Sequence, residues 1–313
     1  MTVFLLRRLA SAAVLLVAVS FIAYVMLYPA AGDIARNVLG ENASEAQVAL
    51  KNHELGLDQP LIVQYFTWLG NALTGNFGNS YFASQPVWKI LEVRLPVTLS
   101  LVVIVTLLTG VLAFAVGLLA AVKRGWIDRT LQVLATLGDA LPAFIVALFL
   151  VTVLAIQLKL FPATGYVAFT KSPGDWARTL TLPVIALTIG GVAGVAQQVR
   201  SSALDVLRHD YVRTVRSRGL SERRIVLTTV LRNASVNGLT TLAVHVVGIL
   251  GGAVVIESVF ALPGLGSLAV ESTSRTDLPL ILGVLLAVVL IIVAVNLIVD
   301  LAVAWLNPKV RLS

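Results

Sequence analysis

The chain has 313 residues, of which 58% are hydrophobic and only 12% are charged, about half the charged share of an ordinary soluble domain. A soluble protein of this length could not bury so much apolar surface, so the composition predicts an integral membrane protein. The net charge of +7 comes from basic residues that lie between long apolar stretches, which is typical of membrane topology and not of nucleic-acid binding. The absence of cysteine excludes disulfides, thiolate zinc sites and cysteine nucleophiles.

Six stretches are long and apolar enough to cross a bilayer, which takes about 20 residues as a helix. These predicted spans lie near 9–29, 96–122, 131–156, 181–200, 236–257 and 279–305. Prolines in or at the starts of spans are tolerated in membrane helices, and glycines in the fourth and fifth spans favour close helix packing. We therefore predict an all-α polytopic membrane protein with six transmembrane helices.

The charges around the spans predict the topology. Fifteen of the 23 Lys and Arg residues would lie on the side of the N-terminus, and eight of these are arginines between residues 200 and 232. Because Lys and Arg accumulate in cytoplasmic segments, we expect both termini to be cytoplasmic. Arg7 and Arg8 precede the first span as in a signal peptide, but its apolar stretch exceeds the usual 7–15 residues or so, so we expect an uncleaved span.

The outer segment between the first two spans is the longest connection on that side. Residues 53–60 indicate a helix end and a turn, and Leu61, Tyr65, Trp68, Leu69 and Leu73 then follow helical spacing. Its aromatic pair, Tyr65 and Trp68, suits a membrane interface. The segment is either a solvated cap or a landing site for a substrate-delivery protein.

The segment 201–235 exceeds the roughly 2–8 residues of an ordinary helix connection. Leu204, Leu207, Tyr211 and Val215 are spaced to share one helix face. Gly219 then suits a helix C-terminus. Ser221 suits the start of a second short amphipathic helix. Such a basic hairpin could lie on anionic lipid, reflect ordinary positive-inside charge, or dock a soluble partner.

Residues 210–221 of this hairpin resemble the coupling loop of ABC importer permeases, most closely the dipeptide/oligopeptide/nickel branch. Other stretches resemble the same branch in the same order: 56–60 with Gln64-Tyr65, 75–80, 94–96, 257–266, 296–300 and 306–311. The chain departs from the branch pattern at a few positions, namely Asn76, Val215, Asn237, Asn307 and Lys309.

The resemblance implies a type I ABC importer permease fold and a bacterial inner-membrane location. The chain would then consist of an N-terminal transmembrane helix (1–30), an extracytoplasmic segment (31–95), a five-helix permease core (96–305) that includes the coupling loop 201–235, and a cytoplasmic tail (306–313). The resemblance also implies a second homologous permease subunit, two cytoplasmic ATPases that use ATP and magnesium, and an extracytoplasmic binding protein. The residues implied to contact an ATPase are Tyr211, Val212, Arg213, Thr214, Val215, Arg216, Gly219, Leu220 and Ser221. We expect import of di- or oligopeptides, with nickel or another small solute as the alternative cargo.

The chain has no G-x-x-x-x-G-K-[ST] phosphate loop, so energy from ATP would have to come from a partner. Ionisable groups within spans usually face a cavity or a partner, which makes Asp139, His245 and Glu257 pathway candidates, or else structural partners in helix packing. Three other classes remain open: a secondary transporter with a midplane ion site, a membrane receptor or scaffold, and a membrane hydrolase, for which no motif is found.

Overall fold

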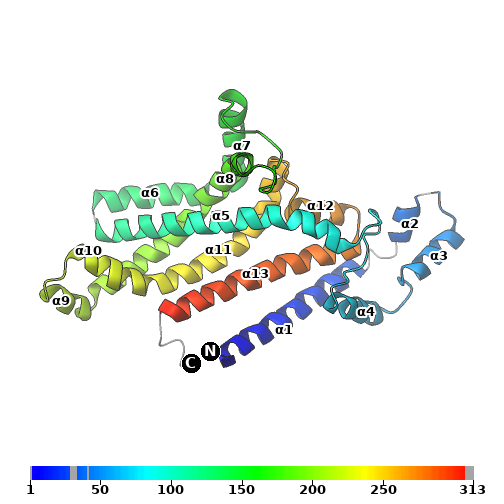
Figure 1. Cartoon of the computed structure of the whole chain (residues 1–313), viewed down its shortest axis with the longest axis horizontal. Coiled ribbons are helices and arrows are strands. Elements are labelled where there is room, and N and C mark those ends of the chain that lie inside the picture. Colours follow the sequence, from blue (N-terminus) through cyan, green and yellow to red (C-terminus); the bar gives the residue numbers. More distant parts are fainter. Residues whose placement is uncertain (1, 29–33, 41, 124, 307–313) are drawn as a thin grey trace. The chain divides into compact units, whose positions relative to one another are not determined.

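The structure is a computed structural model that describes residues 2–28, 34–40, 42–123 and 125–306, and these residues are predominantly α-helical (Figure 1). The elements in chain order are α1 (Thr2–Leu27), α2 (Ile34–Leu39), α3 (Glu45–Glu54), α4 (Leu61–Leu73), α5 (Val87–Val122), α6 (Trp126–Ala140), α7 (Ala143–Leu150), the π-helical η2 (Val151–Gln157), α8 (Pro173–Arg208), α9 (Asp210–Ser217), α10 (Glu222–Ile225), the π-helical η3 (Val226–Val230), α11 (Leu231–Val259), α12 (Leu265–Ser274) and α13 (Leu278–Leu306). The predicted all-α class is confirmed.

The chain packs as two compact units. The N-terminal unit comprises Thr2–Thr98 and Pro263–Ile291, and the central unit comprises Leu99–Leu262 with the chain from Ile292 onward. These units differ from the predicted segments, which were divided at the membrane crossings. In the structure, α1 packs with the segment that follows it and belongs to the same unit. Apart from Leu306, the predicted tail lies outside the described residues.

Five helices of the described chain are long and apolar enough to cross a membrane, and they match five of the six predicted spans. They are Leu6–Leu27, Val87–Val122, Pro173–Arg208, Glu222–Val259 and Leu278–Leu306. The third predicted span is instead a pair of helices, Trp126–Gly138 and Ala143–Gln157, bent by 89°. Pro142 explains the break, since a proline disfavours helical backbone in the residue before it, and Leu141 has φ −88° and ψ 116°.

Two glycines allow the helices of the central unit to approach closely. A Cβ atom on Gly117 of α5 would lie 2.6 Å from the carbonyl oxygen of Ala196 on α8. A Cβ atom on Gly238 of α11 would lie 2.7 Å from the side chains of Phe114 and Val199. Close approach at small residues is a common way for membrane helices to pack, so these positions fix how α5, α8 and α11 meet.

The N-terminal unit is built around Tyr65 of α4, which is 1% exposed. The Tyr65 hydroxyl donates to the Val17 carbonyl oxygen at 3.1 Å and lies 3.0 Å from the Ser20 Oγ, both on α1. The expected aromatic pair is present, with the ring centroids of Tyr65 and Trp68 6.2 Å apart, and the Tyr65 ring packs against α1 in the core.

The predicted helix end and turn at 53–60 are confirmed. α3 ends at Glu54, and Gly56 adopts φ +69°. The His53 Nδ1 lies 2.7 Å from the Asp58 Oδ2, and this hydrogen bond raises the pKa of His53 and lowers the pKa of Asp58. The turn is thus closed by a side-chain pair as well as by glycine.

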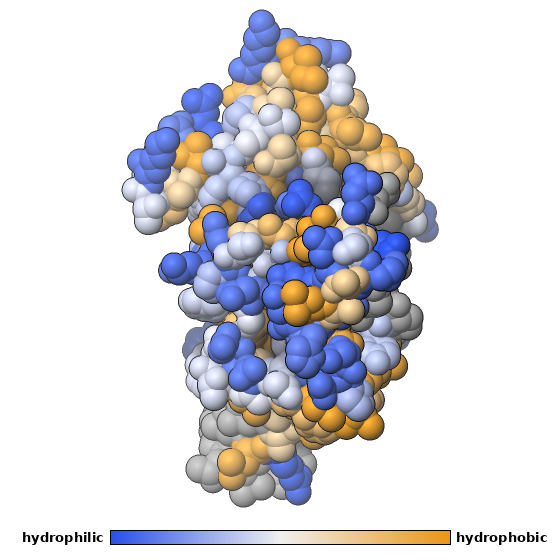
Figure 2. Space-filling model, turned by 90° about the vertical axis from the view of Figure 1, so that its right-hand side faces the viewer, coloured by the Kyte–Doolittle hydropathy of each residue, from blue (hydrophilic) through white to orange (hydrophobic). Residues whose placement is uncertain are grey.

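The surface carries both hydrophilic and large exposed hydrophobic side chains. Figure 2 shows hydrophilic residues gathered over the middle of the face on which α2 and α3 lie in Figure 1. Large exposed hydrophobic side chains line the long helices, as Val14 does on α1, Leu107 on α5 and Ile298 on α13, and they also occur on the shorter α4, as Leu73 does. This distribution fits helices whose sides contact lipid.

A buried carboxylate joins two loops of the N-terminal unit. Asp277, which is 2% exposed, accepts hydrogen bonds from the Ser80 Oγ at 2.5 Å and from the Tyr81 amide at 3.3 Å. The Ser80 Oγ also accepts from the Ala83 amide at 2.9 Å. Because Asp277 directly precedes α13, its charge also faces the positive end of that helix. We call this contact the Asp277 latch; it holds the loop 76–86 against the start of α13.

Replacing Asp277 with alanine should loosen the loop 76–86, because Ser80 and Tyr81 lose a buried acceptor at a cost of about 1–3 kcal/mol. We expect faster proteolytic cleavage within the loop and a lower midpoint of thermal unfolding for the purified protein. Glu54→Gln neutralises an exposed carboxylate of the same unit and should change neither measurement. Equal cleavage rates for Asp277→Ala and the wild type would show that the latch does not hold the loop.

Candidate functional site: the arginine-rich hairpin

The arginine-rich segment folds into a hairpin, which we define as residues 208–226. α8 ends at Arg208, and His209 turns the chain with φ −69° and ψ 144° before the short helix α9 begins. Gly219 then adopts φ +80° and donates its amide to the Arg216 carbonyl oxygen at 3.0 Å. Left-handed backbone of this kind ends helices and favours glycine. The predicted helix end at Gly219 is confirmed.

The chain re-enters a helix at Ser221, which has φ −64° and ψ 145° and precedes Glu222 in the first turn of α10. The sequence predicted that the second helix of the hairpin would be short and separate, and this prediction is wrong. Instead α10, η3 and α11 continue from Glu222 to Val259 as one apolar stretch of 38 residues. The hairpin is therefore attached on both sides to helices long enough to cross a membrane.

A small apolar cluster fixes α9 against these long helices. Val212 of α9 and Ile225 of α10 are fully buried in it. The cluster also contains Ala121, Ala203, Val206, Val230 and Ala234, with Leu118, Leu204, Leu207, Val215 and Leu220 packed against it. Tyr211, which was predicted to share this face, is instead 42% exposed. The helix breaks at His209, so α9 begins a new face on which Val212 points inward.

An ion pair spans the glycine turn. The Arg216 guanidinium donates from Nε to the Glu222 Oε1 and from Nη2 to the Glu222 Oε2, the latter at 3.1 Å. Both side chains are about half exposed, at 47% and 58%, so solvent screens the pair and it adds little to stability. Its bidentate geometry restricts the angle between α9 and α10.

The nine predicted coupling residues fall into two groups. Tyr211, Arg213, Thr214, Arg216, Gly219 and Ser221 are exposed, whereas Val212 is buried and Val215 and Leu220 are partly buried. Helical periodicity places Asp210, Thr214 and Ser217 on the side of α9 opposite Val212. We call these three residues the outer face of α9. The buried residues hold α9 in place, and the outer face is free to meet a partner.

The two pathway candidates whose side chains are described, His245 and Glu257, lie at separate places on α11. His245 is half-buried on α11 and faces Gly191 of α8, where an added Cβ would overlap the imidazole. Glu257 is fully buried near the end of α11, twelve residues further along, which is about 18 Å of helix. Asp139 belongs to α6, but its side chain lies outside the described residues.

Sequence reasoning missed an ion pair that joins α6 to α8. Arg200 donates from Nε and Nη2 to the two carboxylate oxygens of Asp128, each at 2.6 Å. The two side chains are only 26% and 14% exposed. The sequence analysis treated Arg200 only as one of the cytoplasmic basic residues. The signal for a pair was Asp128, an acidic residue among basic residues just before the third predicted span.

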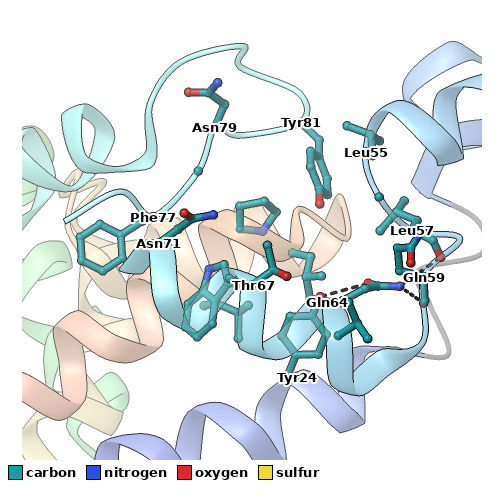
Figure 3. A pocket seen from close by; sticks show the side chains of 17 residues that line it. Tyr24, Leu55, Leu57, Gln59, Gln64, Thr67, Asn71, Phe77, Asn79 and Tyr81 are labelled. Atoms are coloured by element: carbon teal, nitrogen blue, oxygen red, sulfur yellow. Dashed lines mark hydrogen bonds between the residues drawn. The ribbon is translucent and has the colours of Figure 1, made fainter. Parts of the chain in front are cut away.

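The N-terminal unit contains a pocket of about 270 Å³, which Figure 3 shows from close by. The Tyr24 hydroxyl donates to the Gln64 Oε1 at 3.0 Å, and the Gln64 Nε2 donates to the carbonyl oxygens of Leu57 and Gln59 at 3.1 and 2.7 Å. The buried indole N–H of Trp68 has no hydrogen-bond partner among the described residues. None of the described lining residues is charged, so the pocket does not suit the two charged ends of a free peptide.

Two family models match the chain. The model described as the binding-protein-dependent transport system inner membrane component matches residues 113–312. The model for the N-terminal part of such membrane components matches residues 1–102. The two matches together cover nearly the whole chain, including the hairpin and the segment that precedes the second span.

Several relatives match over almost their full length. A protein of Brucella abortus (strain 2308), named as a peptide transport system permease, is 38% identical over 312 residues, or 99% of each chain. A peptide ABC transporter permease protein of Sinorhizobium fredii is 36% identical over 99% of this chain and 100% of its own length. A glutathione transport system permease protein of Shigella flexneri is 34% identical over 98% of each chain.

A solved structure shares the fold. A chain from inward-facing crystals of the MetNI methionine ABC transporter superposes with a TM-score of 0.57 at 16% identity, covering 70% of this chain and 97% of that chain. The fold, the hairpin between two long apolar helices, the full-length relatives and both family models agree. This chain belongs to the family of binding-protein-dependent transport system inner membrane components.

Proposed function

We propose that this chain is a permease subunit of an ATP-driven importer of di- or oligopeptides. The names of its relatives support this cargo, because they describe peptide permeases and a permease for glutathione, itself a tripeptide. The geometry of the hairpin carries the proposal. A short helix with an exposed outer face is fixed rigidly between two helices long enough to cross the membrane.

The proposed partners include the ATPase subunits that supply the energy for import. The sequence of this chain has no phosphate-binding loop of the G-x-x-x-x-G-K-[ST] type, so two separate ATPase subunits bind and hydrolyse ATP with magnesium. They dock on the outer face of α9 and on the exposed Tyr211, Gly219 and Ser221 beside it. A second homologous permease completes the pathway, and an extracytoplasmic binding protein delivers the cargo. Both termini and the hairpin are cytoplasmic.

Movement of the ATPases reaches the membrane through the hairpin. α8 has 36 residues and the stretch Glu222–Val259 has 38, each more than 50 Å as a helix at about 1.5 Å per residue. Because the apolar cluster fixes α9 to both, displacement of α9 tilts them as levers. ATP and cargo then shift the balance between inward-open and outward-open forms by their differential affinity for each.

The break between α6 and α7 marks a part of the pathway. Backbone that is not helical is tolerated at membrane depth only where it is buried in protein or lines a water-filled cavity. The break lies at Leu141 and Pro142, which are two and three residues after Asp139 in the sequence. This placement supports the α6–α7 break as a pathway element and keeps Asp139 as its polar candidate.

Gly219→Val should uncouple ATP hydrolysis from uptake, because a β-branched residue is strained at φ +80° and shifts α9 relative to α10. We expect ATP-dependent peptide uptake to fall roughly five- to thirtyfold, which corresponds to about 1–2 kcal/mol of strain. Uptake and cargo-stimulated ATPase activity are to be measured on the reconstituted complex.

Gly219→Asn is the matched control, because asparagine tolerates left-handed backbone and an added Cβ meets no atom within 4 Å. It should retain near-normal uptake, and both variants should insert into the membrane. Normal uptake by Gly219→Val would show that coupling does not depend on this turn.

The natural absence of cysteine allows a direct test of the proposed orientation. Ser217→Cys on the outer face of α9 should react with a membrane-impermeant maleimide in inside-out vesicles and not in right-side-out vesicles. Ser44→Cys in the outer segment should show the reverse pattern. Labelling of Ser217→Cys from outside would refute the cytoplasmic placement of the hairpin.

A further inference from the structure

A second pocket, of about 390 Å³, lies beside the hairpin within the central unit. It is enclosed by the last turn of α5, the end of α8, one flank of α9 and the start of α10, which meet at one end of this unit in Figure 1. Its lining residues are Ala121, Val122, Leu207, Arg208, Arg213, Arg216, Glu222 and Val226. Four apolar side chains thus lie with three arginines and one glutamate, which gives the pocket a positive charge.

The three arginines are not equally neutralised. Arg216 pairs with Glu222, and Arg213 lies 3.4 Å from the exposed Asp210. Among the described residues, Arg208 has no carboxylate within 4 Å. A guanidinium has five N–H donors, and its planar fork matches a phosphate group in a bidentate manner. The pocket therefore suits an anion, and a phosphate group in particular.

The position of the pocket identifies the source of that phosphate. Ala121 and Val122 form the last turn of α5, so the pocket lies where a membrane-crossing helix ends. Trp126 begins α6 and Trp305 lies at the end of α13, and these side chains are 76% and 72% exposed. Exposed tryptophan at helix ends is typical of the lipid headgroup region. Basic pockets between helices at this level bind lipid headgroups.

We propose that this pocket binds the phosphate group of an anionic phospholipid from the cytoplasmic leaflet. Arg208 is the principal contact, Arg213 and Arg216 supply further donors, and Val122 and Leu207 contact the first part of the lipid chains. The assignment to that leaflet rests on the cytoplasmic placement of the hairpin proposed above.

The lipid site and the proposed ATPase site use different sides of the same helix. Arg213 and Arg216 lie on the flank of α9 that faces the end of α5, whereas Asp210, Thr214 and Ser217 form its outer face. The sequence left lipid contact and partner docking as alternatives for this hairpin. The geometry allows both at once, with the lipid tying the coupling helix to the membrane surface.

The test compares two charge-neutralising variants of the complete transporter, Arg208→Gln and Arg218→Gln. Arg218 is an exposed residue of the same hairpin that does not line the pocket. Each complex is taken from bilayers of phosphatidylcholine and phosphatidylglycerol into detergent, and the retained lipid is measured by native mass spectrometry. We expect the fraction of complexes that carry phosphatidylglycerol to be about fivefold lower for Arg208→Gln than for the wild type or Arg218→Gln. Arg208→Lys should give an intermediate fraction.

Equal retention by Arg208→Gln and Arg218→Gln would overturn the proposal. So would displacement of the lipid by inorganic phosphate with the same dependence on Arg208, which would assign the site to a soluble phosphate compound. A carboxylate of the ATPase seated in the pocket of the assembled complex would overturn it as well. Retention in detergent does not depend on membrane orientation, so a failure of the proposed topology would appear only in the Ser217→Cys labelling.

Discussion

Burial of Val212 and Ile225 at the ends of the long helices is the contact on which the hairpin depends. α9 has only eight residues, and isolated helices shorter than about 12–15 residues are marginal in water. It is therefore stable as a helix because its inner side is buried in the apolar cluster. The same burial fixes the direction of its outer face, so α9 cannot move without the helices that hold it.

The sequence predicted the features that depend on local composition or backbone conformation. Long apolar stretches identified five of the spans, and Gly219 identified the end of α9 because left-handed backbone favours glycine. The break at Pro142 was not predicted, since membrane helices often tolerate proline inside a span. No residue pattern in the sequence indicated that the helix would end at His209. Because of this break, Val212 is buried and Tyr211 is exposed.

Features that depend on distant partners could not be predicted from spacing. The pairs Asp128–Arg200 and Ser80–Asp277 join residues 72 and 197 positions apart, whereas helical periodicity reports only on neighbours three or four positions apart. Glycine content shows a similar limit. The glycines of the fourth and fifth spans were expected to mark close packing, and an added Cβ would indeed lie 2.1 Å from His245 at Gly191 and 3.3 Å from Leu187 at Gly252. At Gly190, Gly194, Gly248 and Gly251, it meets nothing within 4 Å. Close approaches also occur at Gly117 and Gly238, where the neighbouring helix decides the contact.

The scarcity of charge along the spans bears on how a peptide passes through this subunit. His245 and Glu257 lie far apart on α11, and the pocket of the N-terminal unit has no charged lining residue among those described. A pathway has to bind its cargo weakly enough to release it, and fixed charges matched to both peptide termini would oppose release. We therefore place peptide selection mainly in the proposed binding protein. In this proposal the permease contributes a path whose opening follows the hairpin, and the arginines of the hairpin lie at the membrane surface.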